Sequence, residues 1–423
     1  MAPKENAEVD ITNNNTSIPS WIKQEYFEDI ISEEIGKYSK ITKFQPESGS
    51  APGDNYASVM IRILIEVELE DGYIKELPLM MKTTHGESSV GGQMVQEMGI
   101  FDKESEIYEK ILPAFEKLYI EHGKKVDFGP KSYQLSKNPG VENIVLEDLR
   151  PRKFKNANRV EGLDMDHTKS VLRILAEFHA ASAVYYETIG PFADKFNVGM
   201  FDPSKKDMFK EMYKPMVEVI RQSFLKNVDN GEHFTNKMFG DLDEMIDQNI
   251  EMCRIKPEEF NVLNHGDSWC NNIMFNYNDE GKRNETILVD FQMCKYGSPA
   301  QDLLYFIFSS PKQEIRLEKF DYMIKYYHDH LIENLTLLNY PKQMPTLSDL
   351  HISILKNHGW AKSTTFGTLA IVLLEHTENA NIDNFIKTDE EGVNFKNHLY
   401  SNPRYVKCLN DILPWLENRG MLE

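Results

Sequence analysis

The chain has 423 residues, of which 41% are hydrophobic, and this is enough for two lobes or two domains with a sizeable core. Its 47 Lys and Arg against 67 Asp and Glu give a formal net charge of −20. This charge argues against binding to nucleic acid or to an anionic membrane surface through the overall field. The acidity could suit a cationic or neutral substrate, but a solvated acidic surface is the interpretation we favour. Composition says nothing about the oligomeric state.

The N-terminal residues 1–17 are polar and acidic, contain a run of asparagines and have no apolar signal core, so we predict a disordered tail. No apolar run in the sequence is long enough to span a membrane. The four cysteines are few for this length, which is typical of a reducing compartment, and they lack zinc-ligand spacing. We therefore expect a cytoplasmic protein with no membrane partner. We interpret Cys270 and Cys294 as small buried residues.

The next segment predicts a helix followed by a small antiparallel sheet. The helix begins at Pro19 and carries apolar residues on one side. Residues 59–69 alternate between apolar and other side chains, which is the clearest strand pattern in the chain. An Asp-Gly turn leads into a returning strand over residues 73–82. Pro78 in that strand indicates an edge position or a break in pairing, because proline donates no backbone hydrogen bond.

A loop rich in glycine and small residues, residues 49–56, precedes these strands. Its backbone amides could bind phosphates, but it lacks a G-x-G-x-x-G pattern, and an ordinary hairpin loop is the alternative. Lys82 follows the apolar residues 79–81 at the end of the second strand. A lysine at such a position favours pairing with a phosphate or a carboxylate. The alternative is a strand end that faces solvent.

The following long helix is predicted to bury a carboxylate. Glu104 falls on its apolar face, together with Phe101, Tyr108, Ile111 and Phe115. A carboxylate on a buried face needs a cation, and Lys82 is the natural candidate. Pro113 is expected to end or kink this helix.

A short apolar strand over residues 143–146 runs into Glu147-Asp148-Leu149, where we place the boundary between two parts of the chain. We predict an N-lobe over residues 18–147 and a mostly helical C-lobe over residues 148–423. In the C-lobe, residues 204–253 are expected to form two helices whose Met and Phe side chains are core.

Two polar residues on predicted C-lobe helices have two interpretations each. His179 could be catalytic, but support of a neighbouring loop is the interpretation we favour. Asp302 could hold the same loop, but its place in the first turn of a helix beginning near Ser298 explains it without that contact.

The strongest functional signal is His265-Gly266-Asp267 with Asn272, followed by a predicted β-hairpin and Asp290. Phosphoryl transfer needs a carboxylate that orients the attacking hydroxyl and takes its proton, and a carboxylate with an amide oxygen that hold Mg2+. The D-x-x-x-x-N spacing, with a second aspartate after a hairpin, is that of a kinase catalytic loop. The alternatives are that both aspartates only cap turns, or that the neighbouring Asn271 takes the role of Asn272.

These residues resemble the aminoglycoside/choline-kinase group of the protein-kinase-like superfamily. The wider pattern, from about Pro19 to the last helix, is similar to its ecdysteroid-kinase-like branch, which is abundant in insects. The resemblance implies an α+β, two-lobed protein-kinase-like fold. In this fold a small antiparallel-sheet N-lobe precedes a larger helical C-lobe, and ATP binds in the cleft.

The resemblance also implies roles for individual residues. Asp267 would be the base, Asn272 and Asp290 would bind Mg2+, and His265 would position the loop. Lys82, held by Glu104, would bind the phosphates. The remaining nucleotide-binding residues would be Gly53, Asn55, Tyr56 and Ser58 in the loop, and Glu147 and Leu149 at the hinge, where backbone groups read the adenine.

The implied reaction is Mg2+-dependent transfer of the ATP γ-phosphate to a small-molecule alcohol. The implied acceptor is a steroid such as an ecdysteroid, or a plant or xenobiotic alcohol. Gln292 stands where protein kinases carry glycine, and the chain has no A-P-E segment, so a protein acceptor is disfavoured. Two alternatives remain. One is a choline- or aminoglycoside-type kinase, which would need an acidic acceptor pocket near Asp267. The other is a catalytically silent pseudokinase.

Overall fold

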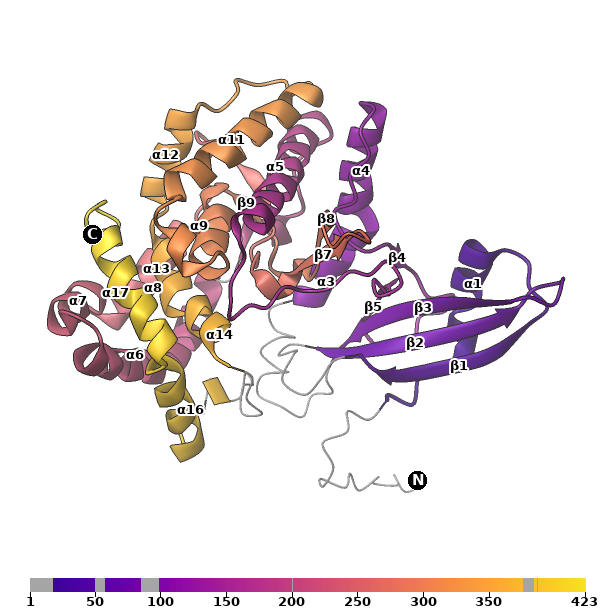
Figure 1. Cartoon of the computed structure of the whole chain (residues 1–423), viewed down its shortest axis with the longest axis horizontal. Coiled ribbons are helices and arrows are strands. Elements are labelled where there is room, and N and C mark those ends of the chain that lie inside the picture. Colours follow the sequence, from indigo (N-terminus) through magenta and orange to yellow (C-terminus); the bar gives the residue numbers. More distant parts are fainter. Residues whose placement is uncertain (1–17, 50–57, 85–98, 200, 376–383, 386) are drawn as a thin grey trace. The chain divides into compact units, whose positions relative to one another are not determined.

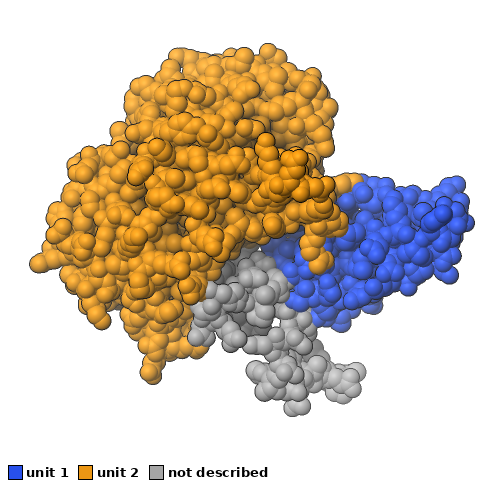
Figure 2. All heavy atoms as spheres, in the orientation of Figure 1, with its two compact units in different colours: residues 1–92, 133–148 blue, residues 93–132, 149–423 orange. Residues whose placement is uncertain are grey.

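The structure, a computed structural model, describes residues 18–49, 58–84, 99–199, 201–375, 384–385 and 387–423. The chain forms two compact units (Figure 2). The first unit comprises residues 1–92 and 133–148, and the second comprises residues 93–132 and 149–423. The helical segment after residue 99 therefore groups with the second unit, although the sequence analysis assigned it to the N-lobe.

The first unit is built on a five-stranded sheet in the order β1-β2-β3-β5-β4 (Figure 1). The pairs β1–β2, β2–β3 and β3–β5 are antiparallel, which confirms the predicted sheet. The strands are β1 (Lys40–Ser48), β2 (Val59–Glu68), β3 (Ile74–Thr83), β4 (Ser132–Tyr133) and β5 (Asn143–Glu147).

Alternate residues of β2 and β3 form much of the core of the first unit. The core-facing side chains of β2 and β3 are buried, as the period-two pattern predicts: Ile61, Ile63, Ile65, Val67, Leu77, Leu79 and Met81. A helix covers this face with Ile30 and Ile31. This helix, α1 (Glu28–Ile35), begins later than the predicted start at Pro19. Before it the chain forms a 3-10 turn (Gln24–Tyr26).

Of the two predictions for Pro78, the edge position is wrong and the break in pairing is confirmed. β3 lies between β2 and β5, and Pro78 is paired with Leu64 of β2. Pairing with β5 begins one residue later, at Leu79, and the Pro78 carbonyl accepts from the Asp148 N–H (3.3 Å). Since N–H and C=O of one residue point to the same side of a strand, the missing N–H falls where β5 ends. The pairing between β3 and β5 therefore stops at the residue that cannot donate.

In the second unit, the helix that carries Glu104 does not end at Pro113. α3 (Ile100–Glu106) continues through a π-helical turn (Ile107–Ile111) into α4 (Leu112–Glu121). Pro113 lies in the first turn of α4. The wider π turn changes the hydrogen-bond register just before the proline, so the chain stays helical without the proline N–H.

Most of the second unit is helical, as predicted, and α5 packs along α11 (Figure 1). Residues 204–253 form three helices rather than two, because a break near Asn230 separates α6 from α7. The helices are α5 (Met165–Thr188), α6 (Lys206–Asn227), α7 (Gly231–Met238), α8 (Leu242–Met252), α9 (Ala300–Ser309), α10 (Gln313–Arg316), α11 (Phe320–Leu337), α12 (Leu347–Lys356), α13 (Gly359–Phe366), α14 (Thr368–Leu373), α16 (Glu390–Tyr400) and α17 (Pro403–Glu417). Within the described part of the chain, none of the helices combines the length and apolarity that crossing a bilayer requires.

Two small antiparallel sheets frame the predicted catalytic loop. The predicted hairpin is confirmed as β7 (Ile273–Tyr277) and β8 (Arg283–Leu288). Just before the loop, β6 (Val262–Asn264) pairs with β9 (Lys295–Gly297), a strand that the sequence analysis did not predict. The loop therefore leaves one sheet and enters the other, which fixes both of its ends.

Candidate active site

The loop between β6 and β7 brings Asp267 and Asn272 together. The Asn272 side-chain amide donates to the Asp267 carboxylate (Nδ2 to Oδ2, 2.8 Å) and to the Asp267 carbonyl (2.9 Å). The hairpin returns the chain to this loop, because the Val289 N–H donates to the Asn272 carbonyl (3.0 Å). Asp290 is the next residue. Asn271 has no such contact with Asp267, so the geometry favours Asn272 over its neighbour.

The pKa of Asp267 lies in the physiological range. Burial raises it from its ordinary value to about 7, and the negative charge of Asp290 adds to this shift. Hydrogen bonds from Tyr305 and Asn272 favour the charged form and limit the rise. The Tyr305 bond is short, 2.5 Å from the hydroxyl to Oδ1. A carboxyl group with such a pKa is suited to take and return a proton near neutral pH.

His265 is locked in one orientation by its own loop. Its Nε2 lies 3.1 Å from the Val289 carbonyl, which can only accept, and its Nδ1 lies 3.3 Å from the Asp267 N–H, which can only donate. These partners require the neutral tautomer with the proton on Nε2. Burial lowers the pKa of His265, which keeps it neutral. This arrangement fits the predicted positioning role of His265, because both ring nitrogens are bound to backbone groups.

Asp302 of α9 anchors the catalytic loop. Its carboxylate accepts from the N–H groups of His265 (2.6 Å) and Gly266 (2.9 Å) and from the Ser268 hydroxyl (3.3 Å). The residue is fully buried. Favourable placement in the first turn of a helix, the interpretation we preferred from the sequence, is therefore not the whole explanation, because the loop depends on this carboxylate for its backbone hydrogen bonds.

His179 supports the same anchor from α5, as predicted. Its Nε2 lies 3.0 Å from the Asp302 carboxylate, and its Nδ1 lies 2.7 Å from the Tyr327 hydroxyl on α11. Burial alone would raise the pKa of Asp302, but the hydrogen bond and charge of His179 hold it below its ordinary value. The anchor is therefore an anion, which strengthens its bonds to the loop.

Asp290 begins the turn after the hairpin in a left-handed conformation (φ 66°). Its N–H donates to the Tyr108 hydroxyl (3.4 Å), and its Oδ2 accepts from the Gln292 amide (3.3 Å). Tyr108 lies one helical turn after Glu104, which is 1% exposed. Burial raises the pKa of Tyr108, and the charges of Glu104 and Asp290 raise it further. The predicted buried carboxylate of α3 therefore lies within electrostatic reach of the Tyr108 that contacts Asp290.

The remaining predicted nucleotide-binding residues are spread over both units. Gly53, Asn55 and Tyr56 lie outside the described residues, whereas Ser58, Lys82, Glu147 and Leu149 are described. Lys82 is only 6% exposed, which argues against a strand end that faces solvent. It belongs to the first unit, as do Ser58 and Glu147, and Glu104 and Leu149 belong to the second. The Lys82–Glu104 pair and the nucleotide contacts therefore stay predictions.

The donors at the loop fit a Mg2+ ion that shares its ligands with phosphates. The described residues contain no group of three or more His, Cys, Asp or Glu side chains that could hold a metal by themselves. Mg2+ in phosphoryl-transfer enzymes uses one or two carboxylates, with phosphates and water for the rest. Because the Asn272 nitrogen is bound to Asp267, its amide oxygen points the other way and remains an available ligand.

An apolar cavity of about 400 Å³ lies in the second unit. Its wall includes Tyr305, the residue bound to Asp267, and Thr368, whose hydroxyl donates to the Tyr305 hydroxyl (3.1 Å). Among the described residues that line it there is no aspartate or glutamate, and Lys362 is the one charged side chain. Much of the wall comes from the helices that we predicted to be ordinary core: Met212, Met216, Ile220, Met238, Met245 and Ile246.

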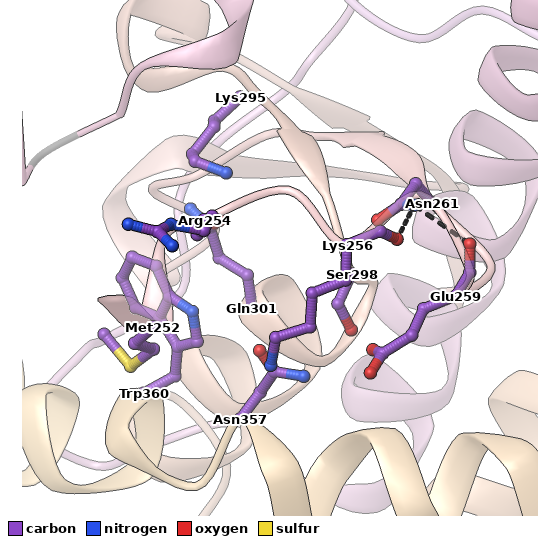
Figure 3. A pocket seen from close by; sticks show the side chains of 10 residues that line it. All are labelled: Met252, Arg254, Lys256, Glu259, Asn261, Lys295, Ser298, Gln301, Asn357 and Trp360. Carbon is purple, nitrogen blue, oxygen red and sulfur yellow. Dashed lines mark hydrogen bonds between the residues drawn. The ribbon is translucent and has the colours of Figure 1, made fainter. Parts of the chain in front are cut away.

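A second, much smaller pocket shares Trp360 with this cavity (Figure 3). Lys295, which is 2% exposed, lines it and donates to the Tyr296 carbonyl (2.9 Å). Asn261 closes one side by donating to the carbonyls of Lys256 (2.8 Å) and Glu259 (2.9 Å). The volume of about 10 Å³ holds roughly one water molecule. Of these two pockets, the larger cavity is the one that can accommodate an organic acceptor.

The sequence analysis missed Tyr305 and Thr368, and it gave Asp302 the weaker of its two roles. A usable signal was present, because Tyr305 follows Asp302 at a spacing of three residues and so lies on the same side of α9. Nothing in the sequence placed Thr368 beside them. Cys270 and Cys294 are buried as predicted, the other two cysteines are buried as well, and none of the four forms a disulfide.

Two solved structures resemble the chain at low similarity. A choline kinase from Cryptosporidium parvum Iowa II is 14% identical with a TM-score of 0.46, over 95% of this chain and 98% of that chain. The amicoumacin kinase hAmiN, in complex with AMP-PNP, Ca2+ and Ami, is 12% identical with a TM-score of 0.36, over 90% and 95%. A search of curated proteins found no match.

The sequence itself identifies the family. The family model for the ecdysteroid kinase-like family matches residues 52–340, which cover strands β2 to β5 of the sheet, the catalytic loop and the hairpin with Asp290. This match confirms the resemblance seen in the motifs, and the α+β organisation of the two units agrees with the predicted fold class. The chain belongs to the ecdysteroid kinase-like family and is, at the level that family membership supports, a small-molecule kinase.

Proposed function

We propose that this protein transfers the γ-phosphoryl group of ATP to a hydroxyl of an apolar, steroid-like alcohol. The observation that carries the proposal is the position of Tyr305, which lines the apolar cavity and is hydrogen-bonded to the carboxylate of Asp267. An alcohol bound in the cavity can therefore present its hydroxyl next to the predicted base.

The lining of the cavity favours a neutral acceptor over a cationic one. A choline or an aminoglycoside carries positive charge, which a site must balance with carboxylates or aromatic rings. The described lining has aromatic rings but no carboxylate, and Lys362 would repel a cation. A volume of about 400 Å³ is within the range of pockets that bind drug-sized ligands. The apolar lining and the volume of the cavity fit a compact, uncharged polycyclic alcohol.

Asp267 would orient the acceptor hydroxyl and take its proton. Asn272 and Tyr305 hold its two carboxylate oxygens, so the direction of the carboxylate is fixed before an acceptor binds. With a pKa of about 7, Asp267 is partly ionised at neutral pH, and the nearby cations of a bound metal and nucleotide would favour its ionised form.

The nucleotide would be held by residues that remain predictions. Asn272 and Asp290 would hold Mg2+, which neutralises the charge of the phosphates when it is bound. Lys82, paired with Glu104, would bind the α- and β-phosphates. The loop residues Gly53, Asn55, Tyr56 and Ser58, and the backbone near Glu147 and Leu149, would contact the rest of ATP. A cytoplasmic location would supply both ATP and Mg2+.

The proposal can be tested by measuring ATP-dependent phosphate transfer to steroid alcohols, choline and an aminoglycoside. We expect transfer to at least one steroid alcohol, and little to the cations. Met216→Trp, which fills the cavity, should raise the KM for the steroid several-fold and leave the KM for ATP unchanged. Leu225→Trp is the matched control, because Leu225 lies on the same helix and is 51% exposed, outside the cavity.

Other results would point to other functions. Transfer to choline or an aminoglycoside, insensitive to Met216→Trp, would show a cationic acceptor and contradict the apolar one. Binding of ATP with no transfer to any alcohol would indicate a pseudokinase. The retention of Lys82, Glu104, Asp267, Asn272 and Asp290 together argues against that alternative.

A further inference from the structure

The small polar pocket of Figure 3 carries an excess of positive charge. Three cationic side chains line it: Arg254, Lys256 and Lys295. The one carboxylate among its described lining residues, Glu259, is already paired with Lys356, which lies outside the lining (2.9 Å). The chain as a whole has a net charge of −20, so composition does not explain this local concentration of positive charge. A pocket of this kind is suited to an anion.

Lys295 is a buried cation with no carboxylate partner in the described part of the chain. It is 2% exposed, and its one hydrogen bond to a described residue goes to the Tyr296 carbonyl (2.9 Å). An ammonium group has three N–H donors, so the others have no protein acceptor. Burial lowers the pKa of Lys295 to about 8, which leaves the group mostly charged at pH 7. Buried charges are normally paired, so a counter-ion is missing.

The Gln301 side chain brings a second unpaired polar group to the same pocket (Figure 3). It is 4% exposed, and its amide makes no hydrogen bond to a described residue. The amide is not sealed off, in contrast with unpaired groups such as the Thr364 hydroxyl, so it opens onto the pocket. Gln301 lies in the first turn of α9, where the positive end of the helix dipole also favours an anion.

Arg254 and Lys256 occupy more exposed positions around the same pocket. The Arg254 side chain is 71% exposed and is paired on the surface with Glu251 (3.2 Å), and Lys256 is half-buried. The pocket holds roughly one atom of the size of a water oxygen. A larger anion would therefore place one oxygen inside and keep the others among the exposed cations. This arrangement of inner and outer donors fits an oxyanion better than a halide.

We propose that this pocket binds a tetrahedral oxyanion, such as sulfate or phosphate, with one oxygen between Lys295 and Gln301. The remaining oxygens would face Arg254 and Lys256. The site shares no residue with the predicted nucleotide site, and the inference does not depend on the proposed function. An ordered water molecule is the competing explanation. It would satisfy the Gln301 amide but leave the charge of Lys295 without a counter-ion.

The experiment measures binding of sulfate and of chloride to the full-length protein by calorimetry, in a gluconate buffer of constant ionic strength. Lys295→Met removes the inner cation, and Arg254→Gln removes an outer one. Lys82→Met is the matched control, because Lys82 is also a buried lysine, 6% exposed, and belongs to the predicted phosphate-binding residues, where sulfate could bind as well. Anomalous diffraction from crystals grown with selenate, which has the shape of sulfate, locates the anion.

We expect Lys295→Met to weaken sulfate binding by about 10-fold or more, and Arg254→Gln by about 2- to 5-fold. Lys82→Met should keep the binding that depends on Lys295. Without sulfate, the melting temperature of Lys295→Met should equal or exceed that of wild type, because the substitution removes an uncompensated buried charge. Arg254 is exposed, so its variant folds and keeps the test decisive if Lys295→Met does not.

Three results would overturn the inference. The first is an absence of sulfate binding and of an anomalous peak in the pocket, as an ordered water predicts. The second is binding that survives Lys295→Met and is lost in Lys82→Met, which would place the anion at the predicted nucleotide site. The third is equal affinity for chloride and sulfate with no effect of Arg254→Gln, which would show a halide site and remove the oxyanion.

Discussion

The hydroxyl of Tyr305 donates a 2.5 Å hydrogen bond to Oδ1 of Asp267 and accepts one of 3.1 Å from the hydroxyl of Thr368. This chain of two bonds connects the predicted base to the wall of the apolar cavity. The loop that carries Asp267 and the apolar cavity are therefore connected within the second unit, and a substitution in one should have a measurable effect on the other.

Tyr305→Phe should move the pH dependence of the reaction to higher pH. The phenol donates to the charged form of Asp267, so its removal should raise the pKa of Asp267 above about 7. Activity at pH 7 should fall several-fold and recover partly at pH 8.5, with the ascending limb of kcat/KM shifted by roughly 0.5 to 1 pH unit.

Tyr119→Phe is the control for this prediction. Tyr119 is a buried phenol whose hydroxyl donates to the Glu177 carbonyl, away from the catalytic loop (2.9 Å). Removing the Tyr119 hydroxyl should lower the stability of the protein without shifting the pH dependence of kcat/KM. An unchanged profile in Tyr305→Phe would contradict a link between the phenol and the ionisation of Asp267.

Asp267→Asn should lower kcat by about 10²- to 10⁴-fold and yet stabilise the protein at pH 8. The folded-state pKa of Asp267 is raised above its unfolded value of about 3.9, so the folded state binds more protons between that pH and about 7. Wild-type stability therefore falls, relative to the variant, as pH rises through this window. The difference should reach about 2 to 4 kcal/mol above pH 7.

Urea unfolding of both proteins at pH 5 and pH 8 measures this difference. At pH 5 most of the folded wild type is protonated at Asp267, and the two proteins should differ less than at pH 8. Equal stability differences at the two pH values would show that Asp267 ionises normally. Full turnover in Asp267→Asn would remove it as the base.

Asp302→Ala should destabilise the protein by about 3 kcal/mol or more, because it leaves buried N–H groups of the catalytic loop without an acceptor. Asp302→Asn retains one acceptor oxygen, so this variant should lose less unfolding free energy, roughly 1 to 2 kcal/mol. Both should reduce kcat more than the KM for ATP, since they loosen the loop that carries Asp267. The measurement is chemical unfolding at pH 7 combined with steady-state kinetics.

Glu116→Gln provides a comparison for the Asp302 variants. Glu116 also accepts from a backbone N–H, that of Phe128 (3.3 Å), but it lies on α4 outside the catalytic loop. Its substitution should leave kcat unchanged. Wild-type kcat in Asp302→Ala would mean that the loop keeps its shape without the anchor.

Gly266→Ala should be severely destabilising. Gly266 has φ 81°, a conformation that costs a residue with a Cβ about 1 to 2 kcal/mol, and an added Cβ would collide with the Met293 carbonyl oxygen. Gly281→Ala separates the two effects, because Gly281 has φ 74° but no atom within 4 Å of an added Cβ. Thermal unfolding should show a loss of about 1 kcal/mol for Gly281→Ala and clearly more for Gly266→Ala. Equal losses would exclude the contact with Met293.

Local patterns in the sequence predicted the sheet, the hairpin and the loop between them, because these depend on residues close in the chain. The alternation in β2 predicted its buried face, and the spacing from Asp267 to Asn272 was sufficient to favour Asn272. The helical spacing also predicted the burial of Glu104 on α3. The family followed from the same motifs, since they lie in one continuous segment.

Local patterns failed where neighbouring elements decide the outcome. Pro78 left open whether β3 is an edge strand or has a break in pairing, and the neighbouring strands decided for the break. Pro113 was expected to end or kink the helix, but the chain continues helical through a preceding π turn. The break that separates α6 from α7 was also missed. In each case the backbone hydrogen bonds depend on atoms that the local pattern does not specify.

What the sequence determined about this protein is therefore its family, its fold class and the identity of the predicted catalytic residues. Only the tertiary structure showed that Asp302 anchors the loop, that Tyr305 contacts Asp267, and that Thr368 lies beside Tyr305 in the wall of an apolar cavity. These residues come from different helices, α9 and α14 (Thr368–Leu373). Hydrogen bonding and burial depend on which helices pack together, and no spacing along the chain contains that information.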